Sequence, residues 1–274
     1  MDIKGKTAVV TGAATGIGRA TSLALAEADV SAIALADIDA EKMQQTAAEI
    51  ERLGTRTLCI PTDVTDIDAL EGMFAKAADE LGGFDIVFNN AGIVSGEPIW
   101  PETPVRKIAQ VAQINLIGIV AGTRIAIDHL SRRGGGAIVN TGSIASFGGA
   151  TGGDDPIYGV TKIAIYHYTL ACKELAESHN IRVNCIMPGV TQTPILGKTG
   201  DGDTPRPTIA AVIESIPLIT AEEIAAGVLT LVMDDERAGE GLVIDNPAAE
   251  GESPPQYRVA DYKSYMDLNL ERLP

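Results

Sequence analysis

Hydrophobic and polar positions are arranged in two kinds of block along the chain. Short, continuously apolar runs rich in β-branched residues cover residues 7–11, 32–36, 86–88, 137–139 and 183–186. Longer amphipathic stretches between them predict helices over about residues 16–28, 39–53, 66–81, 103–130, 155–178 and 220–233. Strands that are apolar on both faces are typical of a parallel sheet covered by helices on both sides. We therefore predict an α/β fold built on a doubly wound, mostly parallel Rossmann-type sheet.

The length of the chain favours one large domain followed by a tail. A chain of 274 residues with 45% hydrophobic content can form a single α/β domain, which we assign to residues 1–250. Residues 251–274 are expected to be disordered, or to pack on the same or a neighbouring subunit as a short amphipathic segment. That segment would use Tyr257, Tyr262, Tyr265, Met266, Leu268 and Leu270. Residues 197–207, dense in Gly, Pro, Asp and Thr, predict an irregular loop that would act as a lid.

Composition and charge exclude several classes of function. The 21 basic and 37 acidic side chains leave a formal net charge of -16, which would repel the phosphates of nucleic acid and of anionic membranes. Cys59, Cys172 and Cys185 are too few and too scattered for a disulfide framework, and neither they nor the three histidines show metal-ligand spacing. Finding no signal peptide and no apolar run of membrane-spanning length, we expect a cytoplasmic protein without a metal site.

A glycine-rich turn follows the first strand and reads Thr11-Gly12-Ala-Ala-Thr15-Gly16-Ile17-Gly18. Glycines permit a tight turn here and let the next helix present its N-terminal N–H groups to a diphosphate. Glycines also mark ordinary loops, so the turn alone is a weak signal. Its position between the first strand and an Ala- and Leu-rich helix favours a dinucleotide site.

The residue at the end of the second strand indicates which dinucleotide binds. Asp37 stands 19 residues after Gly18, where a carboxylate accepts hydrogen bonds from both adenosine ribose hydroxyls and repels a 2'-phosphate. Thr15 and Ile38 nearby are not basic and would not offset that charge. We therefore predict NAD rather than NADP, although Asp37 could also serve only as a solvated helix cap.

Two further polar segments follow the third and fourth strands. Asp63-Val64 and Asn89-Asn90-Ala91-Gly92 are expected at the carboxyl edge of the sheet, where doubly wound folds bind ligands. Asp63 could meet the adenine and Asn90 the ribose side. Each is a weak signal by itself, because Asp and Asn are common turn formers.

Candidate chemistry lies on the helix predicted over residues 155–178. Tyr158 and Lys162 are four residues apart and share one face of this helix. A nearby ammonium, together with an oxidised nicotinamide ring, would favour the phenolate and lower the tyrosine pKa towards the working range. The alternative is an exposed tyrosine beside a solvated lysine. Ser143, after the strand over 137–141, and Asn115, in mid-helix where Asn is unfavourable, favour the catalytic interpretation.

Together these motifs resemble the short-chain dehydrogenase/reductase family, in its compact single-domain form. They occur in the family's order from Lys4 to about Asp245: the glycine-rich turn, Asn89-Asn-Ala-Gly92, Asn115, Ser143, Tyr158-x-x-x-Lys162 and Pro188-Gly189. The resemblance implies that Ser143 orients the substrate oxygen, Tyr158 transfers the proton, and Lys162 tunes Tyr158 and binds the nicotinamide ribose. It also implies that Asn115 holds a water of a proton relay.

The resemblance also bears on the nicotinamide end and on assembly. Residues from Pro188 through Gly189, Val190 and Thr191 to Thr193 would flank the nicotinamide, with the Thr193 hydroxyl near its carboxamide. Members of the family commonly form homotetramers through their two longest helices, so a homotetramer or homodimer is expected. The chain departs from the pattern in Ile244-Asp245-Asn246-Pro247, and in a long link before Tyr158 that contains Gly148, Gly149, Gly152, Gly153, Asp154 and Asp155.

We therefore predict an NAD-dependent oxidoreductase that interconverts a small secondary alcohol and its ketone. An apolar pocket is expected from Ile93, Val94, Ile99, Ala145, Val190 and Ile195, and Trp100 would either wall that pocket or anchor a proline turn. The main alternative is a protein that senses NAD without turnover, since a fold and a nucleotide site alone do not establish chemistry. An epimerase or dehydratase would usually need a larger C-terminal domain.

Overall fold

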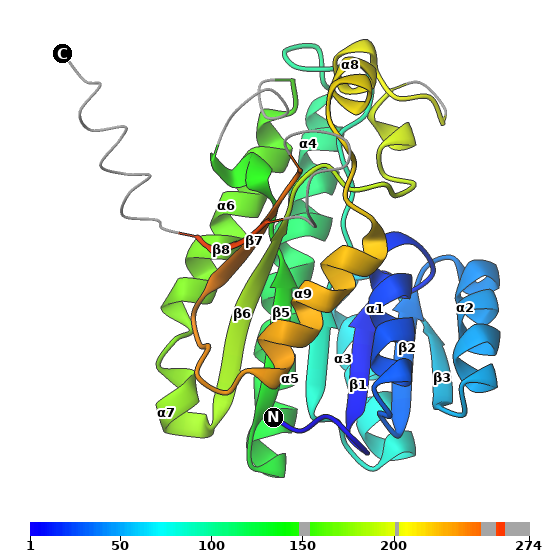
Figure 1. Cartoon of the computed structure of the whole chain (residues 1–274), viewed down its shortest axis with the longest axis vertical. Coiled ribbons are helices and arrows are strands. Elements are labelled where there is room, and N and C mark those ends of the chain that lie inside the picture. The colour runs from blue at the N-terminus through cyan, green and yellow to red at the C-terminus, as the bar shows by residue number, and fades with distance from the viewer. Residues whose placement is uncertain (148–153, 201–202, 248–255, 261–274) are drawn as a thin grey trace.

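The computed structural model describes residues 1–147, 154–200, 203–247 and 256–260. Its described strands form one sheet in the order β3-β2-β1-β4-β5-β6-β7-β8 (Figure 1). They are β1 Thr7–Thr11, β2 Ala32–Asp37, β3 Arg56–Pro61, β4 Ile86–Asn89, β5 Gly136–Thr141, β6 Ile181–Pro188, β7 Gly241–Asp245 and β8 Gln256–Val259. Strands β1 to β7 run parallel and β8 is antiparallel to β7, which confirms the predicted doubly wound, mostly parallel sheet.

Helices cover both faces of this sheet. Those on one face are α1 Gly16–Glu27, α2 Ala40–Arg52 and α9 Ala221–Met233. Those on the other are α3 Ile67–Leu81, α5 Ile119–Arg133 and α6 Pro156–Ala171. Shorter helices are α4 Val105–Ala112, α7 Leu175–His179 and α8 Pro207–Ser215. In Figure 1, α8 lies at the end of the molecule towards which the parallel strands run.

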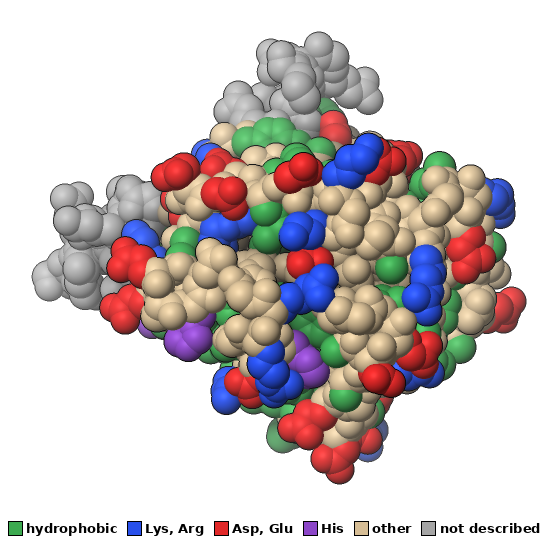
Figure 2. Space-filling view, turned by 90° about the horizontal axis from the view of Figure 1, so that it is seen from below, with side chains coloured by type: hydrophobic (Ala, Val, Ile, Leu, Met, Phe, Trp, Pro, Cys, Tyr) green, Lys and Arg blue, Asp and Glu red, His purple; other side chains and the backbone are tan. Residues whose placement is uncertain are grey.

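The opposite end of the molecule, seen in Figure 2, carries intermingled acidic and basic side chains. Asp85, just before β4, accepts hydrogen bonds from Nε of Arg133 at 2.9 Å and from the backbone N–H of Thr7 at 3.0 Å. Burial acts to raise the pKa of Asp85, but these hydrogen bonds and the positive charges of Arg133 and Lys6 outweigh it, so the pKa is lowered. Asp85 thus connects the start of β1 and the end of α5 to the start of β4.

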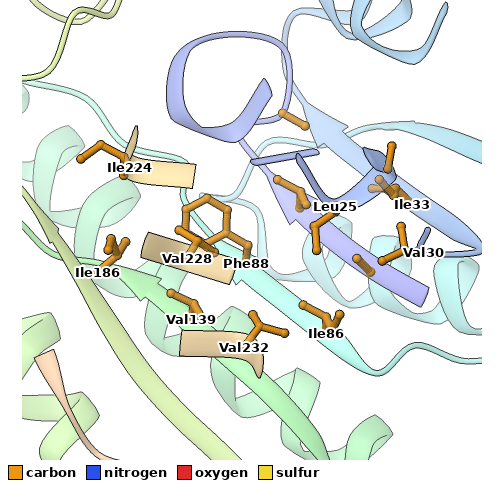
Figure 3. Close-up of a cluster of buried hydrophobic side chains, with 14 of the residues drawn as sticks. Leu25, Val30, Ile33, Ile86, Phe88, Val139, Ile186, Ile224, Val228 and Val232 are labelled. Carbon is orange, nitrogen blue, oxygen red and sulfur yellow. The ribbon is translucent and has the colours of Figure 1, made fainter. Parts of the chain in front are cut away.

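A core of apolar side chains joins the sheet to α1 and α9. Figure 3 shows Leu25 of α1, Phe88 of β4 and Val228 of α9 within it, all buried. Successive residues of a strand point to opposite faces, so Val10 belongs to this core while Val9 joins the core beneath α3 and α5. Burial on both faces is the reason that the middle of β1, Ala8 to Val10, is apolar at every position.

The helix predicted over residues 103–130 is present but is not α-helical throughout. A π-helical turn, Gln113–Gly118, joins α4 to α5 and contains the buried Asn115. Such turns insert an extra residue into the helical repeat, which a 3.6-residue hydrophobic pattern does not reveal. The helix predicted over residues 155–178 is also divided, into α6 and α7.

The continuous helical segment Val105–Arg133 is long and apolar enough to span a membrane, with a mean hydropathy of 1.3 over its window. The expectation that no apolar run reaches this length is therefore wrong. One third of the window, 33%, is buried inside the fold, where α5 packs against α3 and β5. A core helix of a globular domain passes the same test of length and composition.

The hydrophobic pattern does not predict α8, β7 or β8. Residues 197–207, expected to be irregular, begin with a 3-10 turn at Gly197–Thr199 and end where α8 starts. Within the expected tail, β8 pairs with β7 of the same chain, with Val259 opposite Leu242. Several residues named above lie outside the described residues: Gly148, Gly149, Gly152, Gly153, Tyr262, Tyr265, Met266, Leu268 and Leu270.

Candidate active site

A cavity of about 380 Å³ opens at the carboxyl ends of the strands, where the strand order reverses between β1 and β4. Most residues predicted to form the site line it. They are Gly12, Thr15, Gly16, Ile17, Asp37, Ile38, Asp63, Val64, Asn90, Ala91, Gly92, Ser143, Tyr158, Lys162, Pro188, Gly189, Val190, Thr191 and Thr193. Gly18 and Asn115 are not among the lining residues and lie behind it.

The glycine-rich turn connects β1 to α1 as predicted. Gly12 has a φ of 65°, a left-handed conformation that glycine adopts without strain. A Cβ atom on Gly18 would lie 2.0 Å from the carbonyl oxygen of Gly12, so the turn closes this tightly only with glycine. Thr15 occupies the N-cap of α1 without a side-chain cap, which leaves the N-terminal N–H groups of the helix available to an anion.

Asn90 holds the glycine-rich turn from the next strand. Its Nδ2 donates to the carbonyl oxygens of Thr11 at 3.2 Å and Gly12 at 3.3 Å, and its backbone N–H donates to Oγ1 of Thr11 at 2.9 Å. The side-chain amide is thereby used to position the turn. Its predicted contact with a ribose stays a prediction.

Asp37 ends β2 at the rim of the cavity, beside the exposed side chain of Ile38. Its Oδ2 accepts from the backbone N–H of Ala14 at 2.9 Å, and its Oδ1 accepts from that of Asp39 at 2.9 Å. The N-cap of α2 is Asp39, whose side chain accepts from the Lys42 N–H. Asp37 is therefore not the cap of this helix, and its carboxylate is oriented by the glycine-rich turn.

Asp63 occupies the corresponding position after β3. Its Oδ1 accepts from both the backbone N–H of Thr65 at 2.9 Å and the hydroxyl of Thr65 at 2.8 Å. These bonds fix the turn into α3, and the residue also lines the cavity beside Val64. A contact with adenine is compatible with this position and stays a prediction.

Tyr158 and Lys162 lie one turn apart on α6 and both line the cavity. The helix is capped by Asp155, whose Oδ1 accepts from the backbone N–H of Tyr158 at 3.2 Å. Nζ of Lys162 lies 5.5 Å from the centroid of the Tyr158 ring and donates to the carbonyl oxygen of Thr141 at 2.8 Å. Ser143 follows Thr141 by two residues. The side chains of Tyr158, Lys162 and Ser143 therefore meet at the end of β5.

Burial dominates the protonation of this group. It raises the pKa of Tyr158 to about 12, although the hydrogen bond with Ser143 acts in the opposite direction, and the charge of Asp155 adds to the rise. Burial also lowers the pKa of Lys162 to about 8. The expectation that the lysine lowers the tyrosine pKa is therefore not met by the protein's own groups, which favour the neutral phenol.

Asn115 contributes from behind the cavity wall. Its Oδ1 accepts from the backbone N–H of Ile93 at 2.8 Å, and its Nδ2 donates to the carbonyl oxygen of Ile93 at 2.8 Å. A Cβ atom on Gly92 would lie 3.4 Å from Oδ1 of Asn115 and 3.5 Å from Nζ of Lys162. The π-helical turn thus brings Asn115 against the loop after β4, at Gly92, which also lies close to Lys162.

The family model described as short chain dehydrogenase matches residues 6–204, which span both the glycine-rich turn and the Tyr158–Lys162 pair. The chain belongs to the short-chain dehydrogenase/reductase family. It is an oxidoreductase of that family, and several of its sequence relatives are dehydrogenases named for hydroxylated compounds.

Two curated relatives illustrate this similarity. Cis-4-hydroxycyclohexanecarboxylate dehydrogenase of Sinomonas cyclohexanicum is 35% identical over 230 residues, 84% of this chain and 90% of that protein. Human 15-hydroxyprostaglandin dehydrogenase [NAD(+)] is 33% identical over 252 residues, 87% of this chain and 90% of that protein.

Solved structures of related dehydrogenases contain either nicotinamide dinucleotide. NAD+-bound xylitol dehydrogenase is 30% identical, with a TM-score of 0.79, and the match covers 89% of this chain and 99% of that one. A short chain dehydrogenase from Burkholderia cenocepacia J2315 in complex with NADP is 27% identical, with a TM-score of 0.78, over 91% and 99%. The family therefore uses a nicotinamide cofactor, and these neighbours do not discriminate between NAD and NADP.

Apolar side chains predicted to form a pocket contribute to the lining of the cavity. Ile93, Val94, Ala145, Val190 and Ile195 line it, whereas Ile99 does not. Trp100 is 51% exposed and is not a lining residue, so it does not wall the cavity of its own subunit. Its backbone N–H donates to the carbonyl oxygen of Asp154 at 3.4 Å, and Pro101 follows it directly.

The sequence reasoning missed several lining residues, namely Ile114, Ile144, Asp155, Leu196, Thr199, Arg206 and Ile209. Leu196, Thr199 and Arg206 lie on the segment that leads into α8, and Ile209 lies in α8 itself, for which the hydrophobic pattern predicts no structure. A single arginine within a segment of Gly, Pro, Asp and Thr was an available signal for Arg206. Asp155 before Pro156 is a typical N-cap with proline at N1, which agrees with the predicted start of this helix at residue 155.

Proposed function

We propose that this chain is an NAD-dependent dehydrogenase that interconverts a small secondary alcohol and its ketone. The observation that carries the proposal is the meeting of Tyr158, hydrogen-bonded to Ser143, with Lys162 one turn later at the wall of the cavity. In this arrangement Tyr158 acts as general acid or base, with Lys162, Ser143 and Asn115 as its partners.

The residues at the adenosine end fit a nicotinamide dinucleotide. The uncapped N-terminus of α1 and the tight approach at Gly18 suit a diphosphate, and Asp37 suits an unphosphorylated ribose. Ile38, exposed beside Asp37, offers no positive charge to a 2'-phosphate. When bound, the nicotinamide supplies hydride acceptance or donation. The stretch from Pro188 to Thr193 lines the same cavity and would flank the ring.

The chain's own groups handle the proton. In alcohol oxidation Ser143 orients the hydroxyl and the Tyr158 oxygen accepts the hydroxyl proton; in ketone reduction the phenol donates it. With a pKa of about 12, Tyr158 is protonated at neutral pH and ready for the reductive direction. Oxidation requires the phenolate, which added positive charge near the ring favours. We propose that Lys162 also binds the nicotinamide ribose and that Asn115 holds a relay water.

The apolar lining supports a substrate with an apolar or cyclic skeleton, and the hydroxyl in the names of both curated relatives supports a CH–OH group. NAD use favours oxidation as the working direction.

We further propose a homotetramer or homodimer that works in the cytoplasm on a free small molecule. Exposed apolar residues on the helices of the expected interface, Val105 on α4, Ile117 in the π-helical turn and Val160 on α6, support assembly. The formal charge of -16 supports the absence of nucleic acid or an anionic membrane as a partner. The free thiols of Cys59, Cys172 and Cys185 agree with a reducing compartment.

The proposal is tested by assaying a panel of secondary alcohols and ketones with NAD+, NADP+, NADH and NADPH. We expect NAD-linked turnover of at least one alcohol–ketone pair. NAD binding without turnover of any member would instead support a sensor, and kinetics that favour reduction by NADPH would overturn the assigned cofactor and direction.

A further inference from the structure

A buried arginine lines the cavity without a full set of hydrogen-bond partners. The Arg206 side chain is 4% exposed, and its Nε and Nη1 are buried with no hydrogen-bond acceptor among the described residues. A guanidinium removed from water normally has its N–H groups paired, because leaving them unpaired forfeits hydration without replacement. Arg206 therefore has donors available inside the cavity.

Arg182 shows how the same chain treats a buried arginine that has a structural role. Its Nη1 donates to the carbonyl oxygens of Leu231 at 2.9 Å and Asp234 at 3.0 Å, and its Nη2 donates to that of Val232 at 2.6 Å. This guanidinium ties β6 to α9 and does not line the cavity. The contrast indicates that Arg206 is not placed to hold the fold.

The nearest carboxylate does not satisfy Arg206. Oδ2 of Asp154 lies 3.8 Å from its Nε, beyond hydrogen-bond distance, and accepts instead from the hydroxyl of Thr208 at 2.7 Å. Asp154 precedes Asp155, which caps the helix of Tyr158. Arg206 is thus on the catalytic side of the cavity, away from Asp37 at the adenosine end.

We infer that the substrate is a hydroxy acid whose carboxylate is bound by Arg206. The inference rests on the proposed function, because it assigns the second polar group of the same substrate. A planar carboxylate can accept from an edge of the guanidinium that includes one of the unpaired atoms, either Nη1 with Nη2 or Nε with Nη2, whereas the adjacent negative charge of Asp154 disfavours a dianionic phosphate. Leu196 and Ile209 line the same wall, so an apolar skeleton would connect the carboxylate to the hydroxyl at Tyr158.

The kinetic test compares secondary alcohols that differ only in charge. The probes are 3-hydroxybutyrate, 4-hydroxycyclohexanecarboxylate and 11-hydroxydodecanoate, which differ in the distance between hydroxyl and carboxylate. Each is compared with its primary carboxamide, which lacks the negative charge. We expect the wild type to favour at least one carboxylate over its carboxamide by about 10- to 100-fold in kcat/KM, and Arg206→Met to remove that preference. Lys198→Met, which removes an exposed positive charge from the same segment, should keep it.

A binding test separates this inference from the proposed function. Cyclohexanecarboxylate, which has no hydroxyl to oxidise, should raise the Tm of the NAD+-saturated wild type but not of Arg206→Met, and neither cyclohexanecarboxamide nor inorganic phosphate should do so. Without ligand, Arg206→Met should keep or raise the Tm while Arg182→Met lowers it. Affinity for NAD+ should be unchanged in Arg206→Met.

Several results would overturn the inference. In the kinetic test they are equal kcat/KM values of the wild type for each carboxylate and its carboxamide, or an equal loss of activity on both in Arg206→Met. In the binding test they are a Tm loss in Arg206→Met like that of Arg182→Met, weaker NAD+ binding by Arg206→Met, or a larger Tm shift of the wild type with phosphate than with cyclohexanecarboxylate. If neutral alcohols are oxidised without preference for carboxylates, the proposed function stands and Arg206 does not bind substrate. If no probe is oxidised, the wider panel of secondary alcohols and ketones decides the proposed function, and the Tm shift with cyclohexanecarboxylate decides the role of Arg206.

Discussion

Lys162 donates a hydrogen bond from Nζ to the carbonyl oxygen of Thr141 at 2.8 Å. This bond ties α6 to the carboxyl end of β5, the strand that leads to Ser143, and holds the ammonium 5.5 Å from the centroid of the Tyr158 ring. The lysine is buried at 2% exposure. A strand carbonyl, rather than the phenol, therefore sets the distance between the two side chains.

The buried lysine should make stability depend on pH. Burial lowers its pKa from 10.5 to about 8, so between about pH 8 and pH 10.5 the unfolded chain binds a proton that the folded chain releases. Stability from this group therefore rises with pH across that window. We expect the free energy of unfolding of the wild type, measured in urea, to increase from pH 8 to pH 10 relative to Lys162→Met.

Lys76→Met, which removes an exposed lysine of α3, should show no such relative increase. If the difference in the free energy of unfolding between the wild type and Lys162→Met stays constant or falls from pH 8 to pH 10, Lys162 keeps its ordinary pKa in the folded protein.

Tyr158→Phe should remove the group that transfers the proton while leaving the cavity shape unchanged. We expect kcat to fall by about 10²- to 10⁴-fold, the usual contribution of general acid–base catalysis, with NAD+ affinity unchanged by calorimetry. Tyr168→Phe on the same helix is the matched control, since Tyr168 does not line the cavity. Substantial activity in Tyr158→Phe would eliminate the proposed proton transfer.

Asp155 is a positioning residue whose charge also acts on Tyr158. Its carboxylate accepts from the N–H of Ser95 at 2.8 Å, the hydroxyl of Ser95 at 2.7 Å and the N–H of Tyr158 at 3.2 Å. Because its negative charge raises the tyrosine pKa, Asp155→Asn should lower that pKa. We expect the rise of kcat/KM with pH in alcohol oxidation to move to lower pH.

Ser95→Ala distinguishes the two effects of Asp155. It loosens the carboxylate without removing its charge, so it should reduce the rate without shifting the pH profile. A profile that moves equally in both variants would show that the charge of Asp155 does not act on Tyr158.

The sequence alone was sufficient to predict those parts of the site that depend on residue type and on short separations along the chain. Gly12 and Gly18 are required by a positive φ and a close backbone approach, and the i to i+4 spacing places Tyr158 and Lys162 on one face. These features depend on residue type and separation within a few residues. They were therefore predicted correctly together with the parallel sheet.

Features that depend on tertiary burial could not be predicted in the same way. The direction of the Tyr158 pKa shift depends on how completely the phenol is buried, and the carboxylate nearest to Arg206, that of Asp154, comes from a residue far along the chain. The π-helical turn at Asn115 and the edge strand β8 are likewise set by packing, not by local periodicity.

Asp37 should control the choice between NAD and NADP. Its removal in Asp37→Ala takes away the negative charge that would face a 2'-phosphate, and Ile38→Arg in the same chain adds a positive one. We expect the ratio of kcat/KM for NAD+ over NADP+ to fall by at least about tenfold, or roughly 1.4 kcal/mol, in the single variant and further in the double one. A wild type that already prefers NADP+ would show that the Asp37 assignment is wrong.

Gly18 provides a test of the nucleotide turn that does not depend on turnover. A methyl group there would lie 2.0 Å from the carbonyl oxygen of Gly12, so Gly18→Ala must displace backbone rather than a flexible side chain. We expect NAD+ affinity, measured by calorimetry, to fall by at least about tenfold, together with a lower Tm.

Gly72→Ala makes the same chemical change where nothing lies within 4 Å of the added atom, in the middle of α3. It should raise the free energy of unfolding by about 0.5–1 kcal/mol, because alanine loses less conformational freedom than glycine on forming a helix, and it should leave NAD+ binding unchanged. If alanine lowers stability and NAD+ affinity at Gly18 but raises stability at Gly72, NAD+ binding requires glycine at position 18 because of its close approach to Gly12. Full NAD+ affinity in Gly18→Ala would instead show that the diphosphate is bound elsewhere.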